Sequence, residues 1–228
     1  KRIGDMKVDI STKEGRDFIK DMESIPTVSS SEPGRITRGM STFDFDETLI
    51  IDGKNFVVAT NPKTGEVENI SSEDWPSRGT ELMEQGWDFN FDDFVNVRGG
   101  IKGPLFQKLL NRIEKYGPKN NFILTARPQE SAIAIHGWLK SKGVNIPLRN
   151  ITGLGSSVAD AKANWILNKY KEGYNDMYFV DDALQNVEAV KYIMDQLDIK
   201  GNSVQAKLKN SGAMKSKSIN VKFNEMLE

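Results

Sequence analysis

The stretch Met40-Ser41-Thr42-Phe43-Asp44-Phe45-Asp46-Glu47-Thr48-Leu49 decides the fold expected for this chain. It is a short apolar run that ends in two carboxylates. Alternate residues of a strand share a face, so Asp44 and Asp46 can project to the same side where the strand ends. Two ionised carboxylates this close repel each other, and Mg²⁺, which prefers carboxylate, water and phosphate oxygens, would relieve that repulsion. The alternative interpretation is an ordinary acidic loop, so the rest of the chain has to decide between the two.

Three further polar positions occur in a similar context. Thr125 follows the apolar run 121–124, the pair Asp181-Asp182 follows the run 177–180, and Lys162 opens a helix-patterned stretch. Each has an ordinary explanation by itself: a turn hydroxyl, a helix N-cap, a solvated lysine. Chemistry in open α/β folds gathers at the C-terminal edge of the parallel sheet. The order and placement of these residues therefore favour one site over four unrelated features.

The segments between these positions predict an α/β fold. Apolar residues at helical spacing alternate with short apolar strands, and Gly and Pro mark several of the boundaries. This alternation is typical of βαβ units, with a parallel sheet and helices on both faces. A turn-rich tip at 61–65 also predicts a β-hairpin over 56–70. The predicted helices are 104–116, 129–142, 160–170 and 184–197, and the predicted strands after the first are 122–125, 150–153 and 178–180.

The composition excludes several classes of function. The 228 residues suffice for one sizeable core with extensions, and the absence of cysteine excludes disulfides and thiolate metal sites. The single histidine, His136, lies in a helical pattern, which argues against a histidine-based triad. No apolar run approaches the roughly 18 residues that span a bilayer, and no signal-peptide pattern opens the chain. We therefore expect a cytoplasmic protein without a membrane partner, and Lys1 in first place suggests a fragment or processed product.

The organisation predicted along the chain has three parts. Residues 1–39 form a leader and linker, 40–200 the core domain with a flap at about 50–100, and 201–228 a basic tail. Charge is uneven: residues 44–93 contain thirteen acidic and three basic side chains, and lysines predominate after Ile199. Solvated faces explain this in the simplest way. The sharper hypothesis is that the leader and the basic tail bind protein partners, or that the tail docks on nucleic acid.

The order of these motifs resembles the haloacid dehalogenase (HAD) superfamily of aspartyl phosphotransferases. Residues 43–49 match its hydrophobic-Asp-x-Asp-x-Thr-Leu signature, although the family usually has Gly where Glu47 stands. The later motifs would be Thr125, Lys162 and the pair Asp181-Asp182. The resemblance implies a HAD-like (Rossmannoid) three-layer sandwich with a central parallel sheet, a β-hairpin flap and extended termini.

The resemblance also implies catalytic roles. Asp44 would be the nucleophile, and Asp46 would protonate the leaving group and then activate water. Thr125 would hydrogen-bond a phosphoryl oxygen, and Lys162 would neutralise charge on Asp44 and the phosphoryl group. Arg127 would face the substrate phosphate, with a surface salt bridge as the equal alternative.

Mg²⁺ is the cofactor that the resemblance implies. Its ligands would be Asp44, the main-chain carbonyl of Asp46, and Asp181, with Asp182 reaching the metal through water. Asn186, one helical turn beyond Asp182, would support the site.

These roles imply a Mg²⁺-dependent phosphomonoester hydrolase that works through an aspartyl-phosphate. The short insertions around the motifs leave an open site, suited to a nucleotide, a nucleic-acid end or another bulky phosphate. Residues 123–128 resemble phage and bacterial polynucleotide-phosphatase relatives, whereas the acidic flap argues mildly against long polyanions. The alternative is a HAD-like structural or docking module of a larger assembly, such as a phage virion, without turnover. In that case the protein would be virion-associated.

Overall fold

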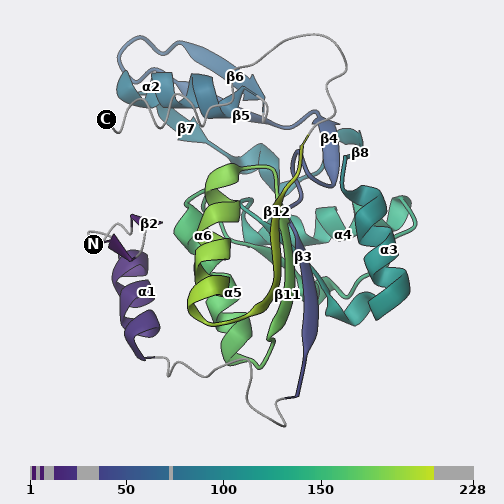
Figure 1. Cartoon of the computed structure of the whole chain (residues 1–228). Helices are drawn as coiled ribbons and strands as arrows, with labels where there is room; N and C mark the ends of the chain where they lie inside the picture. Colours follow the sequence, from purple (N-terminus) through teal and green to yellow (C-terminus); the bar gives the residue numbers. More distant parts are fainter. Residues whose placement is uncertain (1, 4–5, 8–12, 25–35, 72–73, 208–228) are drawn as a thin grey trace.

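A five-stranded parallel sheet forms the centre of the molecule (Figure 1). The structure, a computed structural model, describes residues 2–3, 6–7, 13–24, 36–71 and 74–207. The strands lie in the order β10-β9-β3-β11-β12, and all neighbours are parallel. This confirms the predicted α/β class with a central parallel sheet. The strands are β3 (Gly39–Phe43), β9 (Asn121–Thr125), β10 (Ile151–Gly153), β11 (Asp176–Asp181) and β12 (Lys200–Gln205).

Helices pack on both faces of this sheet, as the alternating pattern predicts. Successive strand residues point to opposite faces, so Phe122 and Leu124 join one hydrophobic core while Ile123 joins the other. The first core lies under α5 (Ala159–Lys171) and α6 (Leu184–Gln196). The second lies under α3 (Phe106–Tyr116) and α4 (Ala132–Ser141). Figure 1 shows these two helix pairs on either side of the strands.

An inserted module lies beyond the C-terminal ends of the central strands (Figure 1). Its stem is the antiparallel pair β4 (Ile50–Gly53) and β8 (Gly99–Lys102). The predicted hairpin is confirmed, because β5 (Phe56–Thr60) and β6 (Val67–Ser71) pair antiparallel, and β7 (Asp88–Asn90) adds a third strand. We call residues 54–98 the flap. The flap has a small hydrophobic core of its own, which consists of Val57, Ala59, Ile70, Leu82 and Trp87.

Short elements complete the chain. Two are the antiparallel pair β1 (Arg2–Ile3) and β2 (Met6–Lys7), and two more are the helices α1 (Lys13–Ser24) and α2 (Thr80–Glu84). One π-helical turn and four 3₁₀ turns are also present among the described residues. These are η1 (Trp75–Gly79), η2 (Asp92–Val95), η3 (Pro118–Asn120), η4 (Gln129–Ser131) and η5 (Leu148–Asn150).

Two elements tie the expected extensions to the core. Ile19 of α1, within the stretch assigned to the leader, is buried in the hydrophobic cluster to which α5 and α6 also contribute. Strand β12, most of which lies in the stretch assigned to the basic tail, pairs with β11 along its whole length. Residues 25–35, within the expected leader and linker, and the basic tail beyond residue 207 lie outside the described residues. Among the described residues, none of the helices combines the length and the apolar character that crossing a membrane requires.

Candidate functional site

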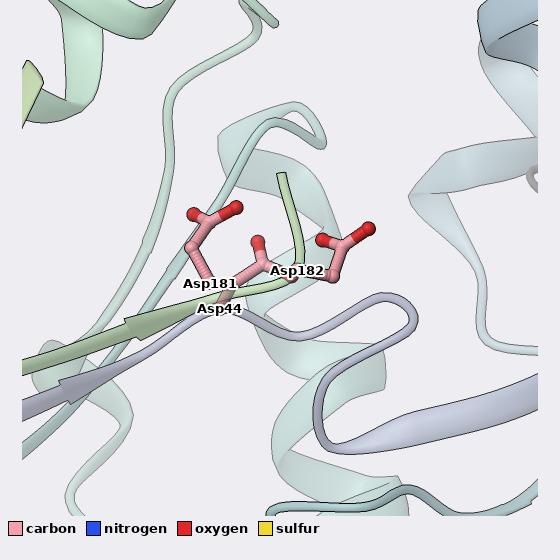
Figure 2. A group of neighbouring side chains, drawn as sticks. All are labelled: Asp44, Asp181 and Asp182. Carbon is pink, nitrogen blue, oxygen red and sulfur yellow. The ribbon is translucent and has the colours of Figure 1, made fainter. Parts of the chain in front are cut away.

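Three carboxylates meet where two neighbouring strands end. Asp44 directly follows β3, Asp181 is the last residue of β11, and Asp182 comes next. The adjacent strands are held together at this point by the Asp44 N–H, which donates to the Val180 carbonyl at 2.8 Å. Each carboxylate offers an oxygen within 4.8 Å of the other two. Figure 2 shows the three side chains projecting to the same side of the strand ends.

Lys162 brings the balancing positive charge. It lies in the first turns of α5, and its Nζ donates to Asp44 Oδ1 at 2.7 Å and to Asp181 Oδ2 at 2.6 Å. The lysine is only 3% exposed, so its ammonium has exchanged water for two carboxylates. The alternative of a solvated helix lysine is therefore wrong, and two acidic motifs and the lysine converge as the sequence predicts.

Asp181 is held from a second side. Its Oδ1 accepts hydrogen bonds from the Ala183 N–H at 3.0 Å and from Asn186 Nδ2 at 2.9 Å. Asn186 therefore supports the acidic group, as its position one turn into the following helix predicts. Its own Oδ1 is buried without a protein partner. A carboxylate with three donors keeps a fixed orientation, and Asp181 is completely buried.

Burial and crowding shift the pKa values in this group. Burial raises the pKa of Asp44 well above its ordinary value, and the neighbouring carboxylates add to this while Lys162 opposes it. Burial, followed by the charge of Asp181, raises the pKa of Asp182 to about 6. Burial alone would lower the pKa of Lys162, but Asp181 and Asp44 outweigh it, and the pKa rises. The lysine thus stays charged while the carboxylates retain protons more readily than usual.

The donor set fits a hard divalent cation. Three carboxylates face a single ammonium, so the charges of the side chains in this group do not balance when all three carboxylates are ionised. Hard cations such as Mg²⁺ take oxygen ligands of this kind, often with retained waters. A cation among Asp44, Asp181 and Asp182 would therefore supply the missing charge.

Asp46 lies outside this group of three. Its carboxylate forms a two-point ion pair with Arg127, whose Nε donates to Oδ2 at 2.8 Å and whose Nη2 donates to Oδ1 at 2.7 Å. Arg127 is only 5% exposed. The salt bridge considered for Arg127 therefore exists, but the arginine is buried rather than on the surface, and its partly buried partner is the second aspartate of the first motif. The metal ligand role of the Asp46 carbonyl stays a prediction.

Thr125 lies at the expected edge of the sheet. It is the last residue of β9, the strand adjacent to β3, and it is buried. Its Oγ1 accepts a hydrogen bond from the Arg127 N–H at 3.2 Å. This bond closes the turn that aims Arg127 at Asp46. The contact of Thr125 with a phosphoryl group stays a prediction.

Two residues that contact the candidate site were not predicted from the sequence. Gln205 at the end of β12 donates from Nε2 to the Asp182 carbonyl at 2.9 Å, and Asn55 of the flap lies 3.4 Å from Arg127 Nη2. Neither has a local signal, because each meets its partner only through the fold. Glu47, which the sequence analysis noted where the HAD signature usually has Gly, has a left-handed φ of 51°, a conformation that favours glycine.

Comparisons with protein-family models, curated proteins and solved structures found no match to this chain. The fold and the site by themselves define an α/β protein. It has a five-stranded parallel sheet, small antiparallel sheets, and a buried acidic triad that could hold a metal ion at the C-terminal edge of the parallel sheet.

Proposed function

We propose that this protein is a Mg²⁺-dependent phosphomonoester hydrolase of the HAD type. One observation carries the proposal: a buried lysine contacts two of three clustered carboxylates at the C-terminal ends of adjacent parallel strands. The order of motifs in the sequence and the strand order support a HAD-like relationship. A metal site built for structure alone would not need a buried lysine among its ligands, because the lysine reduces its attraction for a cation.

The first chemical step belongs to Asp44. One of its oxygens attacks phosphorus, the bond between phosphorus and the ester oxygen breaks, and an aspartyl-phosphate forms. Asp46 enters this step in its protonated form, gives the proton to the departing oxygen, and is left as the carboxylate that pairs with Arg127. Lys162, already bonded to Asp44 Oδ1, holds the carboxylate in position and offers positive charge to the transferring group.

The second step returns the enzyme to its starting state. Asp46 accepts a proton from a water, which attacks phosphorus and breaks its bond to Asp44. Inorganic phosphate leaves, and Asp44 is again a carboxylate. Thr125 would hydrogen-bond a phosphoryl oxygen during both steps. Mg²⁺, held by Asp44, Asp181 and Asp182, would neutralise phosphate charge that would otherwise repel the nucleophile.

The substrate class follows from the shape of the insertions. The flap is a small module on a two-stranded stem rather than a large cap domain, which supports a substrate larger than a small metabolite. We propose a nucleotide, a nucleic-acid end or another bulky phosphomonoester as the natural substrate.

Hydrolysis of p-nitrophenyl phosphate with and without Mg²⁺ tests the function. We expect turnover that needs the metal and is lost in Asp44→Asn, with Asp52→Asn as the matched control, because Asp52 is an exposed acidic residue of the stem. Rapid acid quench should trap phosphate on the native chain but not on Asp44→Asn. A folded native chain without turnover toward this substrate or toward nucleotides and phosphorylated oligonucleotides would instead favour the docking-module alternative.

A further inference from the structure

Every hydrogen-bond donor of the Arg127 guanidinium has a partner. Two of its five N–H groups bind the Asp46 carboxylate, as described above. Two on Nη1 reach the main-chain carbonyls of Phe94, at 3.2 Å, and Asn96. The fifth, on Nη2, points toward Asn55 Oδ1 at 3.4 Å. The group thus has Asp46 on one side and the flap on the other.

Within the flap, Asn55 links the beginning of the flap to its end through hydrogen bonds. Asn55 is buried, and its Nδ2 donates to the Asp93 and Asn96 carbonyls at 2.7 and 3.2 Å. Its Oδ1 accepts the Arg98 N–H at 3.1 Å. The chain leaving the flap, residues 93–98, is therefore tied to the chain entering it. We call residues 93–98 the return segment.

Aromatic rings enclose the same guanidinium. Its central carbon lies 5.4 Å from the centre of the Phe45 ring, which belongs to the first motif, and 4.9 Å from that of Phe94 in the return segment. A buried guanidinium that lies near two rings and is bound to a carboxylate is restricted in its motion and shielded from water. Core and flap contribute one ring each, so the arrangement exists only while the flap is in place.

We propose that Arg127 is a positioning residue that couples the flap to Asp46. Its side chain fixes the orientation of the Asp46 carboxylate only while the return segment supplies its remaining acceptors. Movement of the flap thereby changes the position of the proposed acid and base. This inference has a structural half, that Arg127 links the flap to the Asp46 carboxylate, and a catalytic half, that this link positions Asp46 as acid and base. Only the catalytic half rests on the proposed function.

The geometry favours this role over binding of substrate phosphate. A phosphate could reach Arg127 only by displacing the carboxylate or the flap carbonyls, because no N–H of the guanidinium is left over. Displacement would leave the partly buried carboxylate of Asp46, or the flap carbonyls, without the donors of the buried arginine, which is costly. Among the described residues, moreover, the Asp46 carboxylate accepts hydrogen bonds from Arg127 alone.

Amide hydrogen exchange tests the structural half without any substrate. Asp46→Asn removes the charge that anchors Arg127 and touches no flap residue, yet exchange in the return segment should become faster, on the order of tenfold. Arg127→Lys should do the same. Asp195→Asn is the matched control: it breaks the exposed pair of Asp195 with Lys191 on α6, far from the flap, and should leave the exchange of the return segment unchanged. Unchanged exchange of the return segment in Asp46→Asn would overturn the coupling, even if Arg127→Lys failed to fold.

Kinetics test the catalytic half. Arg127→Lys keeps the charge but loses the two-point geometry, so kcat should fall about tenfold or more while KM changes little. A raised KM with unchanged kcat would show direct substrate binding and would overturn the positioning role. If the native chain shows no turnover, the proposed function fails, and the exchange experiment still decides whether Arg127 couples the flap to Asp46.

Discussion

Lys162 is a buried charged residue whose loss we expect to be costly. It is buried and balances the charge of Asp44 and Asp181, so its loss would leave carboxylates crowded in a dry environment. Breaking a buried ion pair from one side typically costs 3–5 kcal/mol. The ion pair of Lys191 and Asp195 on the surface of α6 has similarly short contacts but is well exposed to water.

We therefore expect Lys162→Met to lower the free energy of unfolding by about 3 kcal/mol at pH 8. Lys191→Met should change it by about 0.5 kcal/mol or less. Urea denaturation of both variants in chelator measures the difference. Addition of Mg²⁺ should restore part of the stability of Lys162→Met, because the cation replaces the lost charge. Equal effects of the two substitutions would contradict the assigned role of Lys162.

The raised pKa values of the acidic group predict a pH-dependent metal site. Asp182 has a pKa of about 6 in the fold against 3.8 ordinarily, so the folded protein holds this proton more tightly than the unfolded chain. Its contribution to the stability of the metal-free protein is then present below pH 3.8 and is lost as the pH rises through 6. Mg²⁺ competes with that proton, so its affinity should increase over the same interval.

Calorimetric titration with Mg²⁺ at pH 5, 6 and 7.5 measures this effect. We expect the affinity to rise with pH and the stabilisation by Mg²⁺ to be greatest above pH 6. In Asp182→Asn the part of the pH dependence that belongs to this carboxyl should disappear, leaving the part from Asp44. A Mg²⁺ affinity that is constant from pH 5 to 7.5 would show that these carboxyls are not the ligands.

At the scale of the secondary-structure elements, substitution of two glycines by alanine should have opposite effects on stability. Gly137 lies on the exposed side of α4, where an added Cβ meets nothing within 4 Å. Gly201 in β12 has a φ of 142°, and an added Cβ would lie 1.7 Å from the Met177 carbonyl oxygen of β11. One position is free for a side chain, whereas the other requires the backbones of two strands to separate.

Gly137→Ala should therefore stabilise the protein by about 0.5–1 kcal/mol, since alanine favours helix. Gly201→Ala should destabilise it by roughly 2 kcal/mol or more, because both the conformation and the contact are unfavourable. Thermal unfolding of the two variants beside the native chain provides the comparison. A neutral Gly201→Ala would mean that β12 does not pair with β11 as closely as described.

For the molecule as a whole, the separate cores of flap and sheet suggest that the flap can be removed. Gly53 and Gly99 lie opposite each other in the stem, so a two-residue Asn-Gly turn can replace residues 54–98. The shortened chain keeps both cores of the central sheet and all three carboxylates. It loses the flap acceptors of Arg127 and with them the anchor of Asp46.

We expect the shortened chain to unfold cooperatively, at a lower temperature than the full chain, and to bind Mg²⁺ with similar affinity. Circular dichroism melting and calorimetric titration measure these properties. Hydrolysis should fall much more than metal binding, because only Asp46 depends on the flap. A shortened chain that no longer binds Mg²⁺ would show that the flap helps to build the acidic site.

Much of the central architecture could be predicted from local patterns. The apolar runs that end at Asp44, Thr125 and Asp181 became β3, β9 and β11, and Lys162 faces the acidic group as the motif order predicts. Runs of this kind are informative because strands that are buried on both faces are rich in apolar residues, although β3 also buries Ser41 and Thr42. The helices between them carry a clear period, so their ends were predicted to within a few residues.

Strand β12 shows where local patterns fail. Its sequence, Lys-Gly-Asn-Ser-Val-Gln, is polar, because an outer strand buries little, and its extended form depends on pairing with β11. The flap shows the same limit: the hairpin had a turn signal, but the third strand and the two-stranded stem had none.

The sequence by itself determined the fold class and the set of residues at the strand ends, because burial imposes a period on the chain that any window of residues reveals. Only the tertiary structure decided which of those residues bind one another. Asp46 and Asp44 are two residues apart, yet one pairs with Arg127, 81 positions away, and the other with Lys162, 118 positions away. Such choices depend on charges and distances between segments that only the folded chain brings together.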